Sequence, residues 1–343
     1  MKKALLLCAT HNDLGLMKSL IKLGFYVIVT GNVNGLPGEK YADKHVLADY
    51  SNKDLILQIA KQEKIDCIIP NCHDYGVRTA AYVAEKLNLP GHDSYEVALQ
   101  ISEKDKFNEF AQKHGILSPA SNKFNNIADA EQFLKNCDYP IIMKPVDCAG
   151  GKGVHRANNF AESSKFLSLA FEYSKAGRIV IEPFITGSQH GFCTFLRDKK
   201  VVLCCSNNEY SILNPYHVEI DTFPSDDFAE NRDKLICIVE KIANILNLKD
   251  GIFHMQYIIQ NGKIYILEVM RRVLGNLYFI PANENIRGGR ILSIGKQGRA
   301  AAYPAKNCNL VSSLWAFTLI NAFWQIATAK LKISLSLKNT INI

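Results

Sequence analysis

A run of glycines follows a short apolar strand pattern that carries one lysine. The strand pattern covers 140–145 with Lys144 near its end, and Gly150, Gly151 and Gly153 come a few residues later. Successive glycines can present backbone N–H groups to an anion and can move as a lid. A lysine inside an apolar strand must reach solvent or neutralise a charged partner, and a phosphate is such a partner. The pattern favours a phosphorylated ligand, although the glycines alone would equally suit a flexible turn.

Two common nucleotide-binding patterns are absent from the sequence. Val146 stands where a P-loop requires its first glycine, and Gly153 follows Lys152 where Ser or Thr is required. The first apolar run, at 3–8, continues into 9–15 without the G-x-G-x-x-G pattern of dinucleotide-binding folds. The sequence therefore excludes a P-loop and argues against NAD binding.

Lys106 is a second candidate for contact with phosphate. It lies on a predicted helix over 102–113, directly after Asp105. Two lysines that converge on a polyphosphate would stabilise the charge on a departing nucleotide. Without such a partner, Lys106 is an ordinary solvated lysine on a helix face.

A predicted hairpin over 253–270 carries candidate metal ligands, and its loop length decides their direction. A two-residue loop at 261–262 would point Gln256 and Glu268 to opposite faces of the sheet. A three-residue loop at 260–262 with a glycine bulge would bring them to one face. The residues that then share this face are His254, Gln256, Glu268 and Met270.

With the three-residue loop, the hairpin predicts a cation site. Gln256 and Glu268 would offer two oxygen ligands to a hard cation such as Mg²⁺. Arg271 and Arg272 follow directly and would present fixed positive charge to an anionic substrate. The alternative is an ordinary edge hairpin with exposed charges.

Regular alternation of strand and helix patterns in the first hundred residues predicts an α/β domain. Such alternation builds an open parallel sheet with right-handed crossovers. Ligands bind at the carboxyl ends of parallel strands, so the segments 10–13 and 71–74 are candidate substrate contacts. The apolar runs lie at 3–8, 25–29 and 66–70, and the helical patterns at 13–23, 54–62 and 76–87.

After the glycine run, the sequence pattern changes to short strands, turns and one long helix. We expect strands at 178–182, 191–197 and 200–205 and a helix at 226–246. Together with the hairpin, this half is predicted to be α+β with antiparallel sheets.

Taken in order, these features resemble the ATP-grasp ligases over about 102–275, half of the chain. Asp105-Lys106 with Gly115-Ile116 and Pro119 is similar to the family's opening D-K…G-I/V…P. The segments 139–145 and 150–154 are similar to its P-x-x-x-K-P…G-G-x-G-V core, and 181–187 looks like its adenine-binding linker. The resemblance implies an α/β N-terminal parallel-sheet domain at 1–100 and a two-lobed α+β ATP-grasp domain at 101–284, with lobes at about 101–180 and 181–284.

The resemblance also implies a role for each matched residue. ATP would be contacted by Lys106, Lys144, Gly150, Gly151, Gly153, Glu182, Ile185 and Gln189. Gln256 and Glu268 would hold Mg²⁺, with Mn²⁺ as a substitute. Arg272 would be the catalytic arginine, with Arg271 beside it.

Two positions depart from the family pattern. Gln189 stands where an acidic residue often binds the ribose, which puts that contact in doubt. Met270 stands where the family usually has an Asn as third metal ligand, and a thioether is a poor ligand for Mg²⁺. We expect one of the two metal ions to be missing or loosely held.

The implied function is an ATP-dependent carboxylate-amine ligase. The γ-phosphate would go to a carboxylate, giving an acyl-phosphate that an amine attacks. Two alternatives stay open: carboxyphosphate chemistry with bicarbonate, as in biotin carboxylase and carbamoyl phosphate synthetase, and an ATP-binding protein that has lost catalysis. The partners are small-molecule carboxylates and amines rather than nucleic acid.

The chain ends in a basic segment without acidic residues. Residues 285–343 hold eight Lys or Arg and no Asp or Glu, whereas all 33 acids lie in the first 284 residues. The bases form no tight cluster, which argues against nucleic-acid binding. Three interpretations of the segment stay open: an amphipathic helix docked on the body or a membrane surface, a transmembrane span over 307–329, or a terminus altered by a frame change or truncation.

Ten cysteines are present without a C-x-x-C pair. Neither a zinc ribbon nor a thioredoxin motif is indicated, and reduced thiols in a cytoplasmic protein fit best.

Overall fold

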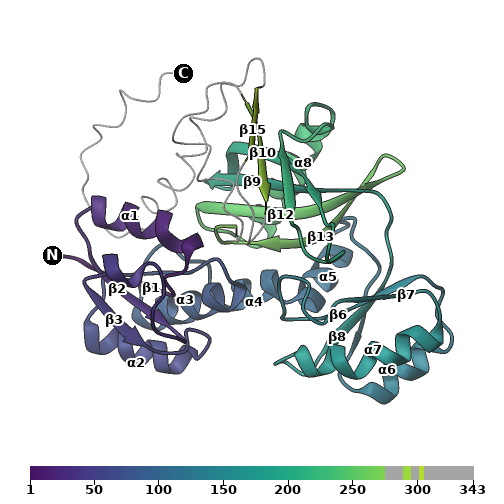
Figure 1. Ribbon diagram of the computed structural model, residues 1–343, viewed down its shortest axis with the longest axis horizontal. Helices are drawn as coiled ribbons and strands as arrows, with labels where there is room; N and C mark the ends of the chain where they lie inside the picture. The colour runs from purple at the N-terminus through teal and green to yellow at the C-terminus, as the bar shows by residue number, and fades with distance from the viewer. Residues whose placement is uncertain (275–288, 295–300, 305–343) are drawn as a thin grey trace.

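The computed structural model describes residues 1–274, 289–294 and 301–304, and its strands form three sheets (Figure 1). The four-stranded sheet nearest the N-terminus is parallel throughout. The other two sheets, of four and seven strands, are antiparallel. The predicted succession of a parallel sheet and then antiparallel sheets is confirmed.

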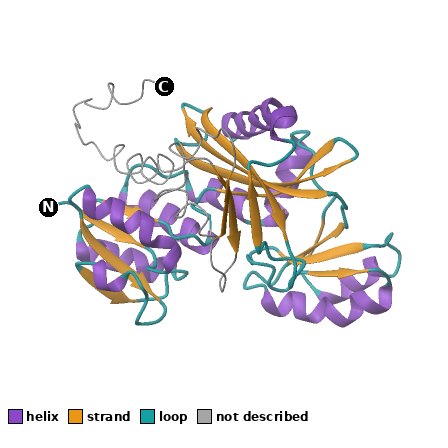
Figure 2. Ribbon diagram, turned by 45° about the horizontal axis from the view of Figure 1, so that its top comes forward, coloured by secondary structure: helices purple, strands orange, loops and turns teal. Residues whose placement is uncertain are grey.

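The parallel sheet has the strand order β3-β2-β1-β4 and is buried on both faces. Along β1, Ala4 and Leu6 pack on the side of α1, whereas Leu5 packs on the side of α2 and α3. Figure 2 shows helices on both faces of this sheet. A strand without a solvent face needs a continuous apolar run, which explains the pattern at 3–8. The elements are β1 (Lys3–Leu6), η1 (His11–Asp13), α1 (Leu14–Lys22), β2 (Tyr26–Gly31), η2 (Glu39–Tyr41), β3 (Lys44–Leu47), α2 (Lys53–Glu63), β4 (Cys67–Ile69) and α3 (Asp74–Leu87).

The small antiparallel sheet has the order β5-β8-β6-β7 and carries two helices on one face (Figure 1). Its core joins Ile141 and Met143 of β6 to Leu134 of α6 and Leu167 of α7. Lys144 therefore alternates with these residues and points to the opposite face. The elements are β5 (Asn122–Phe124), α6 (Ile127–Leu134), β6 (Ile141–Pro145), β7 (His155–Ala157), α7 (Phe160–Tyr173) and β8 (Ile179–Pro183).

The seven-stranded sheet has the order β13-β12-β9-β10-β11-β14-β15. Phe253 and Met255 of β12 pack with Phe107 of α5 and Leu235 of α8 in its core. Because strand side chains alternate, His254 and Gln256 face away from these helices. The elements are α4 (Tyr95–Ser102), α5 (Lys104–Lys113), β9 (Ser188–Arg197), β10 (Lys200–Tyr210), β11 (Ile220–Phe223), α8 (Phe228–Ile245), β12 (Gly251–Gln260), β13 (Lys263–Met270), β14 (Gly289–Ile294) and β15 (Ala301–Pro304).

The hairpin reaches the expected arrangement by a different route. Gln260 pairs with Lys263, so the loop has two residues and the three-residue loop is wrong. The irregularity lies instead in β13, where Tyr257 pairs with Ile266 but Gln256 pairs with Glu268. The extra residue, Leu267, reverses the alternation of β13. Gln256 and Glu268 therefore share one face, as the metal hypothesis requires.

The acid-free segment contributes two strands to the large sheet. β14 pairs with β11, and β15 pairs with β14. The start of the segment predicted as a separate tail is thus part of the sheet. The helix and membrane interpretations concern 307–329, which lie outside the described residues. Within the described ranges, no helix is long and apolar enough to cross a membrane.

Candidate functional site

Lys144 has a carboxylate as its partner in this structure. Its Nζ lies 2.7 Å from Oε2 of Glu182 on the neighbouring strand β8, and both residues are buried. Oε1 of Glu182 accepts a hydrogen bond of 2.8 Å from Nδ2 of Asn108 on α5. The pair satisfies the lysine's need for an anion and fixes the two side chains where β6, β8 and α5 meet.

The glycine run forms a loop whose base and tip are both held. At the base, the carboxylate of Asp147 accepts hydrogen bonds from Tyr75 Oη at 2.9 Å, Ser174 Oγ at 2.9 Å and the backbone N–H of Ala176 at 3.0 Å. At the tip, Gly151 has φ +71° and lies against the backbone of Tyr216, whose carbonyl oxygen would be 2.5 Å from an added Cβ. The loop therefore rests on the segment between β10 and β11.

Lys104, which sequence reasoning missed, joins the glycine loop to the hairpin. Its Nζ donates to the carbonyl oxygen of Cys148 at 2.7 Å and lies 3.4 Å from Oε2 of Glu268. Lys106 instead pairs with Glu103 at 3.0 Å, and its side chain is 37% exposed. The structure thus brings Lys104, rather than Lys106, to the predicted metal ligands.

The helical periodicity of α5 could have indicated Lys104 rather than Lys106. Lys104 is three residues before Phe107 and seven before Ala111, which are both buried, so it lies on the packed stripe. Lys106 is three residues before the exposed Glu109, on the opposite side of the helix.

The hairpin places two oxygen-bearing side chains directly opposite each other. Gln256 pairs with Glu268, and the Glu268 side chain is 32% exposed, so its carboxylate is accessible. An amide oxygen and an accessible carboxylate on one face fit a hard divalent cation. Met270 pairs with His254 in the next row of the same face and supplies no oxygen. Within the described residues, no group of three or more His, Cys, Asp or Glu could hold a metal ion, so the fit depends on Gln256.

The adenine and ribose candidates lie at the junction of β8 and β9. Glu182 is in β8, and the half-buried Ile185 lies in the connection between the two strands. Gln189 is in β9, and its Nε2 donates to Oε2 of Glu209 at 3.0 Å. Glu209, on β10, is a buried acid that sequence reasoning did not single out. Burial raises the pKa of its carboxyl.

Both consecutive arginines are held by acids from the first part of the chain. Arg271 Nε lies 2.9 Å from Oδ2 of Asp93, and Arg272 Nε lies 2.6 Å from Oδ1 of Asp74. Burial would raise the pKa of the Asp74 carboxyl, but the charge of Arg272 and its hydrogen bonds hold that pKa below the usual value. The positive charges that the sequence assigned to a substrate are thus compensated within the protein.

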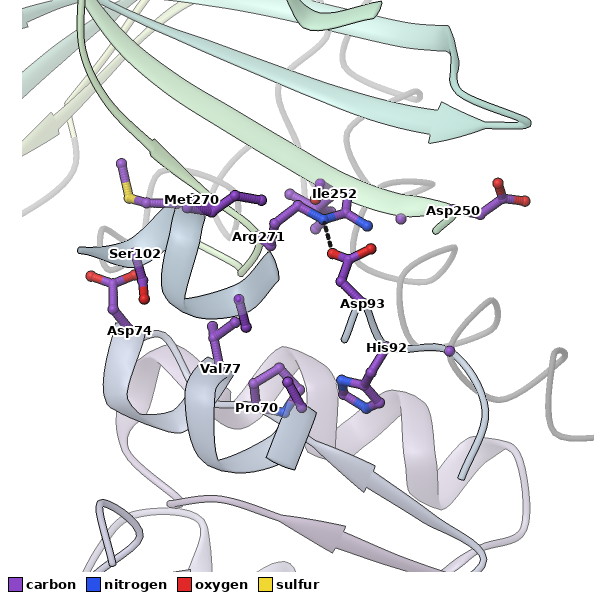
Figure 3. Close-up of a pocket in the computed structure, with 15 residues that line it drawn as sticks. Pro70, Asp74, Val77, His92, Asp93, Ser102, Asp250, Ile252, Met270 and Arg271 are labelled. Atoms are coloured by element: carbon purple, nitrogen blue, oxygen red, sulfur yellow. Dashed lines mark hydrogen bonds and ion pairs between the residues drawn. The ribbon is translucent and has the colours of Figure 1, made fainter. Parts of the chain in front are cut away.

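A narrow crevice lies beside these ion pairs (Figure 3). It holds about 30 Å³ and is lined by Pro70 and Val77 on one side and by Ile252 and Met270 on the other. A second crevice of about 10 Å³ shares Asp74 and Met270 with it and reaches Lys104 and Glu268. The Asp93–Arg271 ion pair and the candidate ligand Glu268 therefore line neighbouring crevices.

The two loops predicted as substrate contacts lie side by side. The backbone N–H of Cys72 donates to Oδ1 of Asp13 at 3.3 Å, and Nδ2 of Asn12 lies 3.7 Å from Sγ of Cys72. Asp13 is fully buried, and burial raises the pKa of its carboxyl. The carboxyl ends of β1 and β4 meet here, as expected for neighbouring parallel strands.

Residues 103–276 match the family model described as carbamoyl-phosphate synthase L chain, ATP binding domain. The carbamoyl phosphate synthase large chain of Clostridium botulinum (strain Langeland) is 24% identical over 273 residues, which are 77% of this chain and 25% of that protein. This chain thus spans about a quarter of the length of the curated relatives it matches.

Solved structures share the fold. N5-carboxyaminoimidazole synthetase from Staphylococcus aureus, complexed with ADP, has a TM-score of 0.71 and 15% identity, and the match covers 93% of this chain and 97% of that one. The biotin carboxylase domain of the 2-oxoglutarate carboxylase from Hydrogenobacter thermophilus, in complex with MgADP, ADP and bicarbonate, has a TM-score of 0.70 and 18% identity, covering 85% and 73%.

Proposed function

The chain belongs to the family of carbamoyl-phosphate synthase large-chain ATP-binding domains, within the ATP-grasp proteins, and from this premise we propose that it is an ATP-dependent carboxylate-amine ligase. ATP would lie between the lobes at 101–180 and 181–284, with domain 1–100 adding substrate contacts. The observation that carries the proposal is Lys104, which contacts the glycine loop and the hairpin acid Glu268 together.

The nucleotide site would use side chains from both antiparallel sheets. Lys144, Lys104 and the backbone N–H groups of Gly150, Gly151 and Gly153 would contact the phosphates, since all lie on or beside the glycine loop. Glu182, Ile185 and Gln189 would contact the nucleoside. Lys106 keeps its sequence-based assignment as a phosphate contact, but its ion pair with Glu103 makes its share the smaller one.

Gln256 and Glu268 would hold Mg²⁺, or Mn²⁺ in its place, through their side-chain oxygens. When bound, the cation neutralises charge on the phosphate oxygens. Lys104 is placed to balance the Glu268 carboxylate while that acid has no cation beside it.

The reaction proceeds in two displacements. A carboxylate oxygen of the substrate attacks the γ-phosphorus and ADP leaves, which gives an acyl-phosphate. An amine then attacks the acyl carbon, and phosphate leaves as the amine nitrogen loses a proton. Lys104 and Lys144 would offset charge on the transferring phosphoryl group, and the glycine loop would exclude water that otherwise hydrolyses the acyl-phosphate.

Arg272 would bind the substrate carboxylate or the acyl-phosphate, with Arg271 supporting its position. A guanidinium has five N–H groups. Within the described part of the chain, three hydrogen bonds of Arg272 go to Asp74 and the carbonyl oxygen of Val273. The other two N–H groups would serve the anion, while Asp74 fixes the plane of the guanidinium.

A second candidate is carboxyphosphate chemistry, in which bicarbonate takes the place of the carboxylate. The names of the similar proteins favour it, since they include carbamoyl phosphate synthases and a biotin carboxylase domain with bound bicarbonate.

The deciding experiment measures ADP release by the full-length protein with Mg²⁺ and pools of amino acids, other carboxylates, amines and bicarbonate. We expect one carboxylate and one amine to stimulate release, and Glu268→Gln to lower it about 100-fold or more. Glu240→Gln, which removes an acid on the far helix α8, is the matched control. Stimulation by bicarbonate alone would favour the second candidate. Binding of ATP without turnover from any pool would contradict a ligase.

A further inference from the structure

One row of residues crosses the large sheet through the candidate metal ligands. Glu268 on β13 pairs with Gln256 on β12, Gln256 pairs with Gly191 on β9, and Gly191 pairs with Asn207 on β10. Residues paired across antiparallel strands point to the same face. The row therefore has side chains at three of its four positions and an opening at Gly191.

The opening at Gly191 is filled by side chains from neighbouring positions. A Cβ at Gly191 would lie 2.6 Å from Oδ1 of Asn207, 2.8 Å from Oε1 of Glu209 and 3.0 Å from Cε1 of His254. Glu209 is two residues after Asn207 on β10, so it points to the same face. The missing side chain at Gly191 lets Glu209 extend across β9 toward β12.

Glu209 holds two glutamine amides at once. Its Oε2 accepts hydrogen bonds from Nε2 of Gln256 at 2.9 Å and from Nε2 of Gln189 at 3.0 Å. Because Oε2 accepts both bonds, the amide group that faces Glu209 is the NH₂ group of each glutamine. Each glutamine therefore turns its carbonyl oxygen away from Glu209. For Gln256, this orientation leaves the oxygen as the atom available to a cation.

This orientation matters more here because the hairpin itself offers few oxygen ligands on this face. Met270, in the next row, supplies a thioether, and Glu268 is the one acid opposite Gln256. A neutral amide whose NH₂ group faced the cation would repel it. Glu209 is 8% exposed, so its hydrogen bonds are little weakened by competition with water.

We propose that Glu209 is a positioning residue for the divalent-cation site, acting by fixing the Gln256 amide with its oxygen toward the cation that Gln256 and Glu268 share. The inference rests on the proposed function, since it concerns the same cation. It predicts that the need for Glu209 depends on an amide being present at position 256.

The test is a double-mutant cycle that compares Glu209→Met with and without the amide at position 256. Glu209→Met removes the acceptor and keeps an unbranched side chain of similar length. In the natural background, Gln256 can then rotate, and we expect Mn²⁺ affinity to fall about tenfold or more. In a Gln256→Ala background no amide is left to orient, so Glu209→Met should change the affinity by less than about threefold. Glu109→Met, on the exposed face of α5, is the control for loss of an acid.

The affinity is measured on the full-length protein by electron paramagnetic resonance, from the signal of free Mn²⁺, with and without a non-hydrolysable ATP analogue. An equal loss in both backgrounds would overturn the inference, because a direct ligand or a simple charge effect acts in both. No loss in either background, or no Mn²⁺ binding by the natural protein, would also overturn it. Calorimetric binding of the ATP analogue without metal tests the proposed function separately. If the analogue does not bind, the double-mutant cycle measured without nucleotide still decides the role of Glu209.

Discussion

Neighbouring lysines on α5 have opposite surroundings. Lys104 contacts the glycine loop and Glu268, whereas Lys106 pairs with Glu103 and is 37% exposed. The family resemblance pointed to Lys106 because Asp105 precedes it. The two-letter motif and the packed stripe of the helix thus favour different lysines.

The two lysines give a paired prediction. Lys104→Met should lower ATP-dependent ADP release about 100-fold, since a cation beside the phosphates is lost. Lys106→Met should lower it less than about fivefold, because an exposed ion pair contributes at most about 1 kcal/mol. The two variants remove the same charge from one helix, so a larger effect of Lys106→Met would favour Lys106 as the main phosphate contact.

The burial of His92 gives a prediction for how the free energy of unfolding changes in mild acid. Burial lowers the pKa of the His92 imidazole below its usual value of 6.5, although its Nε2 lies 3.0 Å from the carbonyl oxygen of Ile68. The unfolded chain therefore takes up the proton at a higher pH than the folded one. The free energy of unfolding should fall as pH drops below about 6.5, by at most about 1.4 kcal/mol per pH unit for this group.

Urea unfolding between pH 5 and pH 8 measures this slope. His92→Gln should make the slope shallower, and His11→Gln is the control because His11 is exposed. An unchanged slope in His92→Gln would show that His92 is not protonated differently in the two states.

At the scale of elements, apolar patterns in the sequence predicted the strands and helices of the core. They did not predict the edge strand of the parallel sheet. The buried β1 and the helices α2 and α3 were expected within a few residues of their bounds. The edge strand β3 was missed because Lys44–Leu47 has no buried residue and thus no apolar run. Helix α7 was also missed, although its buried Ser163, Leu167 and Ala170 recur at helical spacing.

The hairpin shows why the site was harder to predict than the fold. A glycine after Asn261 suits either loop length, and a bulge at Leu267 leaves no mark in the local sequence. Contacts such as Glu209 with Gln256 depend on register across three strands, which a single sequence does not specify. The roles of the predicted nucleotide and metal residues stay predictions until the experiments above are made.

The contact between the glycine loop and the segment that joins β10 to β11 gives a further prediction. Gly151 and Gly177 both have left-handed φ values, +71° and +64°, but only Gly151 lies against another segment, at Tyr216. Gly151→Ala should raise the KM for ATP, because the added Cβ keeps the loop from resting on that segment. Gly177→Ala introduces similar backbone strain in open space and should leave the KM unchanged.

Limited proteolysis provides the structural readout for this pair. Cleavage near Lys152 should be faster in Gly151→Ala than in the natural protein. Equal cleavage rates and equal KM values in the two variants would show that the contact with Tyr216 has no part in ATP binding.

At the scale of the whole molecule, the first part of the basic segment has a structural role. β14 and β15 extend the large sheet beyond β11, so the start of the segment completes the edge of that sheet. A chain that ends at residue 306 keeps both strands. In a chain that ends at residue 284, β11 still pairs with β10 but becomes the exposed edge strand of the sheet.

These two truncations should behave differently. The 1–306 chain should unfold at nearly the same temperature as the full chain, whereas 1–284 should unfold earlier and aggregate. Calorimetry and light scattering measure both properties. Equal behaviour of the two truncations would mean that β14 and β15 contribute nothing to stability.

The ion pairs that link the end of β13 to the first hundred residues join partners that are far apart in time as well as in sequence. Asp74 and Arg272 are separated by 198 residues, and Asp93 and Arg271 by 178. At about 5 to 20 residues per second, a ribosome makes Asp74 roughly 10 to 40 seconds before its arginine. During that interval both carboxylates lack their arginine partners. We therefore expect the parallel sheet to form first, with docking of the large sheet as a late step in the life of the nascent chain.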